Sequence, residues 1–324
     1  MTPSESTALP LVSIGMPVYN GAHTVRRALD SLLAQDYGDF ELVISDNAST
    51  DGSWDVLQEY AARDPRIKLS RNNQNRGAAY NFNRVFELAQ GEYFMWAACD
   101  DWWETGFISV CLQRLTADPA AVGCYAGDYP IPGDRVAQMA SAAPWERVQG
   151  VARGWAGSSV MIYGVFRRDA LGQALPVLNL EAPDGVILLR LAACGPLIYL
   201  SQPMHHYIVS RRNAITRLRS MGRKANFWNL LKWDVGLARA MIRAVWHAPG
   251  IGFGLRLHMA GTALTFAAGI CGWPYPMRVI SRYIATIIPA SAFYPVFKRL
   301  HAHPRLLNQM RRLTGMHLNL PPDV

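Results

Sequence analysis

The sequence predicts an α/β protein with a mixed, mainly parallel sheet, followed by a basic helical region. Three observations carry this prediction. Short apolar runs alternate with amphipathic segments up to about residue 129, polar residues gather directly after the apolar runs, and long, basic, aromatic segments follow residue 210. Strands that alternate with helices favour parallel βαβ units with right-handed crossovers. We therefore expect one domain over residues 1–210 and a second region over residues 211–324.

The elements follow from the hydrophobic spacing. The apolar runs predict strands at residues 11–16, 40–45, 67–70, 92–98 and 121–126. Helical spacing lies between them, at residues 22–35, 53–63, 76–90 and 105–116, and in the first of these Val25, Leu29, Leu32 and Leu33 share one face. Residues 128–158 are rich in Pro, Gly and Ala and predict a long loop or flap. Order is expected to return at residues 159–168, in a helix at 184–194 and in strands around 197–200 and 206–209.

The charge of the chain is divided unevenly between its two parts. Half of the 324 residues are hydrophobic and 17% are charged, which excludes a disordered chain. Residues 1–210 contain 15 Lys and Arg and 22 Asp and Glu, whereas residues 211–324 contain 17 Lys and Arg and only two acidic residues, Asp234 and Asp323. The net charge of +8 is the sum of these two opposite parts. The strongly basic composition of residues 211–324 indicates that this region binds an anionic surface.

The cysteines and the N-terminus indicate the cellular compartment. The five cysteines are widely spaced and include no C-x-x-C pair, which disfavours a disulfide framework or a zinc site. Residues 1–10 are polar, and no basic stretch followed by an apolar run precedes the first strand, so no secretory signal is visible. We therefore expect a reducing, cytoplasmic setting.

Polar side chains follow the first two predicted strands, at the edge where parallel sheets bind ligands. The first strand ends in Pro17-Val18-Tyr19-Asn20, which is equally typical of a simple turn. The second ends in Asp46-Asn47, and Asp51 and Ser53 follow before a helix. An N-cap role for Asp51 or Ser53 explains part of this cluster. It does not explain Asp46, whose carboxylate can accept from a base N–H or a ribose hydroxyl.

Two adjacent carboxylates, Asp100 and Asp101, follow the fourth predicted strand. Such a pair is costly after an apolar strand unless it is solvated, paired or bound to metal. Oxygen ligands suit Mg²⁺ or Mn²⁺, which would neutralise a diphosphate. An acidic helix N-terminus is the alternative. No Gly-rich phosphate loop follows the first strand, which disfavours a nucleotidyltransferase or a dinucleotide-binding oxidoreductase.

Together these loops resemble the family 2 glycosyltransferases, which have the Rossmann-like GT-A fold. The resemblance covers roughly residues 10–210, and its motifs are Pro17-Val18-Tyr19-Asn20, residues 45–53, Asn75-Arg76-Gly77 with Asn81, and Asp100-Asp101. It implies transfer of a sugar, with inversion, from a nucleotide-diphosphate donor to a glycan or lipid-linked glycan in cell-surface polysaccharide or glycoconjugate synthesis. It also implies a divalent metal, Mg²⁺ or Mn²⁺, on Asp100 and Asp101. The implied donor-binding residues are Pro17, Val18, Tyr19, Asn20, Asp46, Asn47, Arg76, Asn81, Asp100 and Asp101.

The chain departs from the family pattern at Ala98. The family usually has Asp-x-Asp over positions 98 to 100, so the first carboxylate is missing and contacts to the donor ribose must come from elsewhere. Asp100 aligns with the usual metal ligand, and Asp101 extends it. This departure leaves open an alternative function, a non-catalytic, membrane-associated scaffold of a glycan-assembly complex.

The resemblance also implies a catalytic base. Inversion by direct displacement needs a group that takes the proton of the acceptor hydroxyl. In this family the base precedes a helix ending in Arg-Leu, and Asp184 stands there, ahead of Arg190-Leu191. Pro183 replaces the Glu that the family commonly has before the base. Asp184 could also cap the helix, and the two roles are compatible.

Candidates for cations that bind the diphosphate, and for a further metal ligand, follow Asp184 in the sequence. Arg211 and Arg212 are the candidates for stabilising the leaving group. His205 and His206 could offer a further metal ligand, with His206 as the weak candidate, although a pair of histidines in a strand more often reflects surface or core packing.

The last third predicts association with a membrane surface. Residues 225–246 have helical spacing, residues 259–277 are uncharged but borderline for a spanning helix, and the uncharged residues 283–297 are too few. Basic, aromatic helices of this kind favour a peripheral or monotopic position on the cytoplasmic face. The aromatic side chains expected at the interface are Trp228, Trp233, Trp246, Trp273 and Tyr275. A helical subdomain packed on the first domain is the alternative, and no motif indicates nucleic acid as a partner.

Overall fold

The computed structural model describes residues 11–127, 131–153, 159–179 and 183–207, and the single positions 240, 243 and 246. The strands are β1 (Val12–Val18), β2 (Phe40–Asp46), β3 (Ile67–Arg71), β4 (Tyr93–Trp96), β5 (Trp102–Trp103), β6 (Gly123–Gly127), β7 (Val165–Arg167), β8 (Leu197–Ser201) and β9 (His205–His206). The helices are α1 (Val25–Leu33), α2 (Ser53–Ala61), α3 (Ala78–Leu88), α4 (Phe107–Ala117), α5 (Gly133–Met139), α6 (Pro144–Arg153), α8 (Arg168–Ala174), α9 (Pro183–Cys194) and the 3-10 helix η1 (Ser159–Tyr163).

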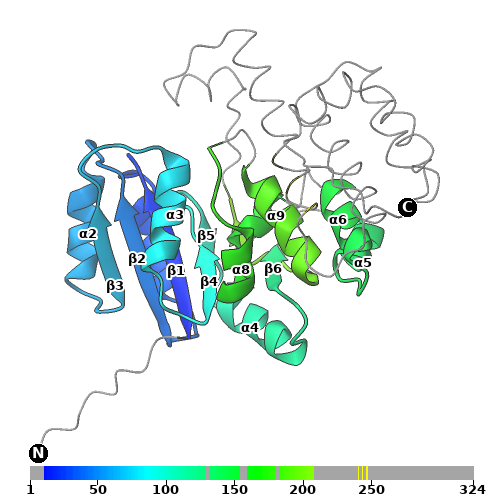
Figure 1. Ribbon diagram of the computed structural model, residues 1–324. Coiled ribbons are helices and arrows are strands. Elements are labelled where there is room, and N and C mark those ends of the chain that lie inside the picture. The colour runs from blue at the N-terminus through cyan, green and yellow to red at the C-terminus, as the bar shows by residue number, and fades with distance from the viewer. Residues whose placement is uncertain are drawn as a thin grey trace, which may run out of the picture.

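A seven-stranded sheet in the order β3-β2-β1-β4-β7-β6-β8 forms the centre of the described chain. Strand β7 runs antiparallel to both of its neighbours, and the other pairs in this sheet are parallel. Strands β5 and β9 form a separate antiparallel pair. The predicted mixed, mainly parallel α/β sheet is therefore confirmed. In Figure 1 the half with β1 to β3 is blue, and the half with α8, α9 and β6 is green.

The parallel strands β1 and β2 were predictable because both of their faces are buried. Every residue of β2 is buried, as is every residue of β1 except the half-buried Pro17. Such strands read as continuous apolar runs. Helix α1 packs its apolar face inward as predicted, with Val25, Leu29 and Leu32 buried, while Leu33 lies at the border of that face.

Between residues 100 and 170 the structure contradicts one expectation, confirms another and adds a strand. Residues 128–158 are not simply a loop, since they contain α5 and α6. The valines of α6 that lie three positions apart, Val148 and Val151, are both fully buried. The ordered stretch near residues 159–168 is η1 followed by the antiparallel β7, and β5 was not foreseen at all.

Little of the basic second region falls within the described residues. Ala240, Arg243 and Trp246 are helical, which agrees with the end of the helix predicted at residues 225–246. Ala240 belongs to the hydrophobic core, and the half-buried Trp246 packs against it, while the expected interfacial position of Trp246 stays a prediction. Residues 211–239 and 247–324 lie outside the described part of the chain. Among the residues that are described, no helix is long and apolar enough to cross a membrane.

Candidate active site

The loops that follow β1 and β2 are joined by hydrogen bonds. Gly52 holds the N-cap position of α2, so the predicted N-cap role of Asp51 or Ser53 is wrong. Their side chains accept from the β1 loop instead. Four bonds of 2.9 to 3.0 Å make this connection, and they run from Asn20 N to Ser49 Oγ, Thr50 N to Asn20 Oδ1, Gly21 N to Ser53 Oγ and Ala22 N to Asp51 Oδ2.

Asp46, the candidate for recognising the nucleoside, ends β2 and is completely buried. Arg71 Nε lies 3.0 Å from Asp46 Oδ2, and the Ser49 amide donates to the same oxygen at 3.2 Å. The Arg71 guanidinium also lies 4.9 Å from the centre of the Trp54 ring. Arg71 was missed in the sequence, although it ends the neighbouring strand in register with Asp46. A base that contacts the Asp46 carboxylate would therefore also meet Arg71.

Three of the predicted donor-binding residues have side chains that hold the loops. The Asn47 amide donates to Asn75 Oδ1 at 2.8 Å, and its oxygen accepts from the Arg76 amide at 3.0 Å. Asn81 lies buried in α3 and donates to Ser45 O at 2.7 Å. The Val18 side chain is fully buried in the hydrophobic core. These residues shape the site without offering their side chains at its surface.

The surface of the site presents other side chains. Tyr19, the first residue after β1, is 48% exposed, and Asn20 beside it is also exposed. Arg76 is exposed, and its guanidinium lies 3.7 Å from the centre of the Tyr80 ring. Pro17 is half-buried. The Tyr19 ring and two cation–aromatic pairs, Arg76 with Tyr80 and Arg71 with Trp54, thus border the edge where a nucleotide would bind.

The two carboxylates after β4 differ sharply in environment. Asp100 is exposed, and its carbonyl oxygen accepts from Arg27 Nη2 at 3.0 Å. Asp101 is only 4% exposed, and its Oδ2 lies 3.2 Å from Nε2 of the fully buried His205. The other ring nitrogen of His205 lies 3.0 Å from the Tyr125 hydroxyl. Asp101 is therefore held by a buried imidazole that is itself held by a tyrosine.

The pairing of β5 with β9 selects which of the two histidines meets the site. Trp103 is in register with His205, and the two rings stack with centres 4.9 Å apart. His206, the weak candidate from the sequence, instead lies 2.8 Å from Glu104 Oε1 and stacks on Trp102. The structure therefore brings His205, not His206, to Asp101. Only tertiary pairing distinguishes the two.

The acidic pair offers ligands that suit a divalent metal. Asp100 supplies an exposed carboxylate and Asp101 a second one beside it, whereas both ring nitrogens of the buried His205 are engaged, by Asp101 and by the Tyr125 hydroxyl, so that His205 positions Asp101. Mg²⁺ and Mn²⁺ accept carboxylate oxygens, and ions of this kind are commonly held by one or two carboxylates together with substrate phosphates. The described residues contain no group of three or more His, Cys, Asp or Glu side chains arranged to hold a metal by themselves. The donor set thus fits a metal shared with a diphosphate.

Asp184 lies in the first turn of α9 and lines a cavity of about 300 Å³. Tyr163, at the end of η1, lines the same cavity, and its ring centre lies 5.5 Å from that of His205. Burial raises the pKa of Tyr163 above its usual range, and the carboxylates of Asp101, Asp184 and Asp100 raise that pKa further. Tyr163 therefore lies within electrostatic range of all three predicted acidic site residues. It was missed because a tyrosine in an apolar run reads as core.

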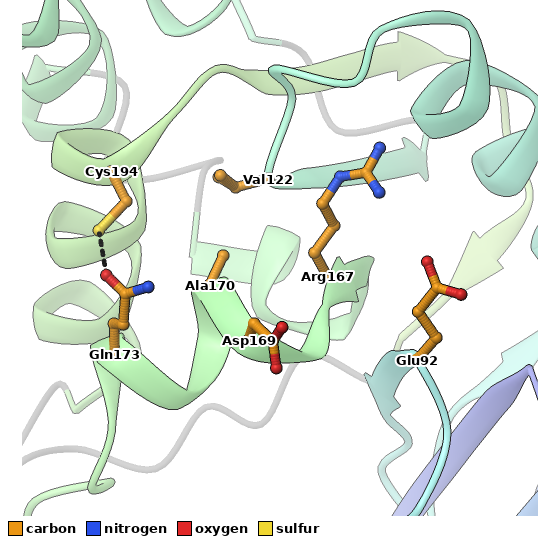
Figure 2. A pocket seen from close by; sticks show the side chains of 7 residues that line it. All are labelled: Glu92, Val122, Arg167, Asp169, Ala170, Gln173 and Cys194. Carbon is orange, nitrogen blue, oxygen red and sulfur yellow. Dashed lines mark hydrogen bonds between the residues drawn. The ribbon is translucent and has the colours of Figure 1, made fainter. Parts of the chain in front are cut away.

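Another cavity, of about 320 Å³, lies at the opposite edge of the sheet (Figure 2). Glu92 and Val122 precede β4 and β6, so this is the amino end of the parallel strands. The Arg167 guanidinium beside it already donates to Leu115 O and Ala121 O, at 2.7 and 3.0 Å. This cavity is separate from the carboxylates described above. The remaining sequence candidates, Arg211 and Arg212, lie outside the described residues.

Comparison with known proteins gives the same assignment. A model described as "Glycosyl transferase family 2" matches residues 13–173. The chain is 40% identical over 134 residues to WcaA of Escherichia coli K12, a glycosyl transferase assigned to colanic acid biosynthesis, and the match covers 41% of this chain and 47% of WcaA. The chain is also 37% identical over 101 residues to WfaP of Escherichia coli, a UDP-Glc:alpha-D-GlcNAc-diphosphoundecaprenol beta-1,3-glucosyltransferase. This second match covers 31% of this chain and 39% of WfaP. The matches thus span less than half of these relatives.

Solved structures agree on the fold. TarS of S. aureus (residues 1–349, with UDP-GlcNAc) gives a TM-score of 0.61 at 14% identity, covering 83% of this chain and 79% of that one. The mannosyltransferase PcManGT of Pyrobaculum calidifontis, in complex with GDP-Man and Mn²⁺, gives 0.53 at 18% identity, covering 96% and 84%. At such identities the likeness concerns the GT-A fold alone. With the family match over residues 13–173, the chain belongs to the family 2 glycosyltransferases.

Proposed function

We propose that this protein is a metal-dependent, inverting glycosyltransferase that acts in the synthesis of a cell-surface polysaccharide or glycoconjugate. Its donor is a nucleotide-diphosphate sugar, and its acceptor is a glycan or a lipid-linked glycan. The observation that carries the proposal is the position of Tyr163, which lines the same cavity as Asp184 and whose ring centre lies 5.5 Å from that of His205, the partner of Asp101. Carboxylates from two distant loops of the sequence thus surround one region. That is the arrangement that a displacement at a sugar carbon needs.

Within this proposal Asp184 is the general base. Its carboxylate takes the proton of the acceptor hydroxyl as that oxygen attacks the anomeric carbon, while the bond from this carbon to the donor diphosphate breaks. Asp184 lines the cavity from the first turn of α9, where the positive end of the helix dipole favours its ionised form. Attack from the side opposite the leaving group gives inversion.

Asp100 and Asp101, with His205 beside them, would hold the divalent metal at the other side of the region. That ion, when bound, neutralises the charge that develops on the leaving diphosphate. His205 keeps the Asp101 carboxylate oriented, because its second ring nitrogen is fixed by the Tyr125 hydroxyl. Asp46 and Arg71 would meet the nucleoside, and Arg211 and Arg212 remain our candidates for further contacts to the diphosphate.

A peripheral position on the cytoplasmic face of a membrane completes the proposal. It is supported by the excess of basic residues after residue 210 and by the similarity to WfaP, a glucosyltransferase that acts on a diphosphoundecaprenol-linked sugar. Attraction to an anionic leaflet contributes about 1 kcal/mol for each Lys or Arg near it. The full chain should therefore sediment with anionic vesicles and not with neutral ones. Equal sedimentation with both would refute an electrostatic attachment.

The substitution Asp184→Asn tests the base. We expect it to slow the release of nucleoside diphosphate from an active donor by about 10²- to 10⁴-fold, because the amide cannot accept the proton. Binding of the nucleotide should change little, since Asp184 contacts the acceptor. The matched control is Asp169→Asn, which removes an exposed aspartate from the first turn of α8, beside the cavity at the far edge of the sheet. Full activity of Asp184→Asn would refute the assignment.

A further inference from the structure

The cavity beside Asp184 is unusually poor in polar groups for a site that handles sugars. Its walls are mainly aromatic and aliphatic, and they include Phe82, Trp96, Val160, Ile162, Val177 and Ile187. Among the described side chains that line it, only Asp184, Tyr163 and the Trp96 indole carry polar atoms. The indole Nε1 already donates to Phe82 O at 3.1 Å. Within the described part of the lining, a bound group therefore meets polar side-chain atoms at Asp184 and Tyr163.

An apolar wall discriminates between substituents of a sugar. A hydroxyl group that enters such a wall gives up its hydrogen bonds to water and gains none, which is unfavourable. A methyl group at the same place removes apolar surface from water and is favoured. The volume of about 300 Å³ lies at the small end of the usual range for ligand sites, which suits a single sugar unit.

The position of the cavity identifies the sugar that enters it. Tyr163 lines the cavity, and its ring packs near His205, which holds Asp101. Asp184, the proposed base, thus lines the cavity directly, and the Tyr163 ring connects the cavity to His205 and its partner Asp101, in the acidic pair that would hold the donor diphosphate. The sugar attached to that diphosphate lies between these two groups. The donor sugar is thus the occupant that the arrangement favours.

We propose that this cavity selects a donor sugar that carries a methyl group, on an acetamido substituent or as a 6-deoxy carbon, over the matching sugar with a hydroxyl there. The inference rests on the proposed glycosyltransferase function and names its donor class. The methyl group packs against the wall formed by Val160, Val177 and Ile187. The polar part of the sugar faces Asp184 and Tyr163.

Matched donor pairs test this proposal with the full chain and Mn²⁺. One pair compares N-acetylglucosamine with glucose, the other compares fucose with galactose of the same configuration, and each is presented on uridine, guanosine and thymidine diphosphate. We expect the methyl-bearing member of one pair to bind at least about tenfold more tightly, as is typical when an apolar pocket distinguishes one carbon group. The pair that shows the difference tells which kind of methyl group is selected.

A polar substitution in the wall provides the second arm. Val160→Thr places a hydroxyl in the cavity with little change of size and should reduce the methyl preference several-fold. Val136→Thr is the control, because Val136 is also half-buried but lies in α5 and does not line the cavity. Thermal unfolding of both variants checks that they fold. Equal or tighter binding of the hydroxyl-bearing donors, or a preference unchanged in Val160→Thr, would overturn this proposal alone, whereas no binding of any donor would overturn the proposed function with it.

Discussion

At the scale of single residues, some carboxylates near this site stabilise the loops through hydrogen bonds, and others are our candidates for metal binding and catalysis. Asp51 belongs to the first kind. Burial alone would raise its pKa, but hydrogen bonds from the Ser53 hydroxyl and from the Ala22 and Ser53 amides outweigh this effect and lower the pKa below its ordinary value of 3.8. These bonds connect the β1 loop to the start of α2. Asp51 therefore stabilises the loops that carry Tyr19 and Asp46.

Stability should depend on pH through Asp51. A carboxyl group whose pKa is lowered on folding contributes stability above its unfolded value, and this contribution is lost as the pH falls through the lower, folded pKa. Asp51→Asn should therefore lower the denaturation midpoint at pH 7, and the deficit should shrink below about pH 4. The control is Asp55→Asn, an exposed position in the first turn of α2. A deficit that is the same at pH 7 and pH 3 would contradict this role.

The candidate site residues differ in whether the sequence alone could identify them. Asp46, Asp101 and Asp184 could be named as candidates from the sequence, because carboxylates at strand ends or helix starts are visible as a pattern along the chain. Arg71 and Tyr163 could not, and of the pair His205 and His206 the sequence favoured His206. The register of β3 with β2 brings Arg71 to Asp46, and the pairing of β9 with β5 selects His205 as the histidine that meets Asp101. Tyr163 becomes a site residue only when η1 folds back beside Asp184.

At the scale of elements, α6 fixes the end of the helix that carries Asp184. Arg147 in α6 is 4% exposed, and its Nε donates to Ala192 O at 2.6 Å. Its two terminal nitrogens donate to Ala193 O at 3.2 Å and to Ala142 O at 2.7 Å. Burial lowers the pKa of Arg147, yet these carbonyls satisfy its donors. One side chain thus binds the last turn of α9, since Ala192 and Ala193 lie there.

Loss of this guanidinium should be costly. Arg147→Met keeps the apolar stem but leaves buried carbonyl oxygens without donors, so we expect the free energy of unfolding to fall by about 3 kcal/mol. The matched control is Arg114→Met, an exposed arginine in the last turn of α4, which should change it by less than about 1 kcal/mol. Denaturant titrations measure both. Similar small losses would show that α6 does not anchor α9.

The elements differ in how well the sequence foretells them. Strands β2 and β4 are buried on both faces, as is β1 except at Pro17, and these three stand out as apolar runs, whereas only Ile67 of the edge strand β3 is buried. Strands β5 and β9 have two residues each, which is too short for any periodicity. Strand β7 has three residues and runs antiparallel because of partners far away in the chain. Helices α5 and α6 have seven and ten residues, and they are stabilised by tertiary packing, since α5 packs on α6 and α6 packs on α9.

At the scale of the whole molecule, the sheet explains why one edge carries the site. Strands β1, β2 and β4 are parallel, so their carboxyl ends bring Tyr19, Asp46 and Asp101 to the same edge. The insertion from α5 to α9 then brings Asp184 and Tyr163 to the same region. This combination was predictable as a GT-A fold from loop motifs and their order. The boundary near residue 210 and the role of the basic region after it stay predictions.

The central claim is that this edge binds a nucleotide sugar together with a divalent metal. Calorimetric titration of the full chain with common nucleotide sugars, in Mn²⁺ and in a chelator, tests it most directly. The account predicts saturable binding of at least one nucleotide sugar in Mn²⁺ and binding at least about tenfold weaker in the chelator, a difference of about 1.4 kcal/mol. If no nucleotide sugar binds under either condition, the claim is contradicted and a non-catalytic scaffold becomes the better explanation.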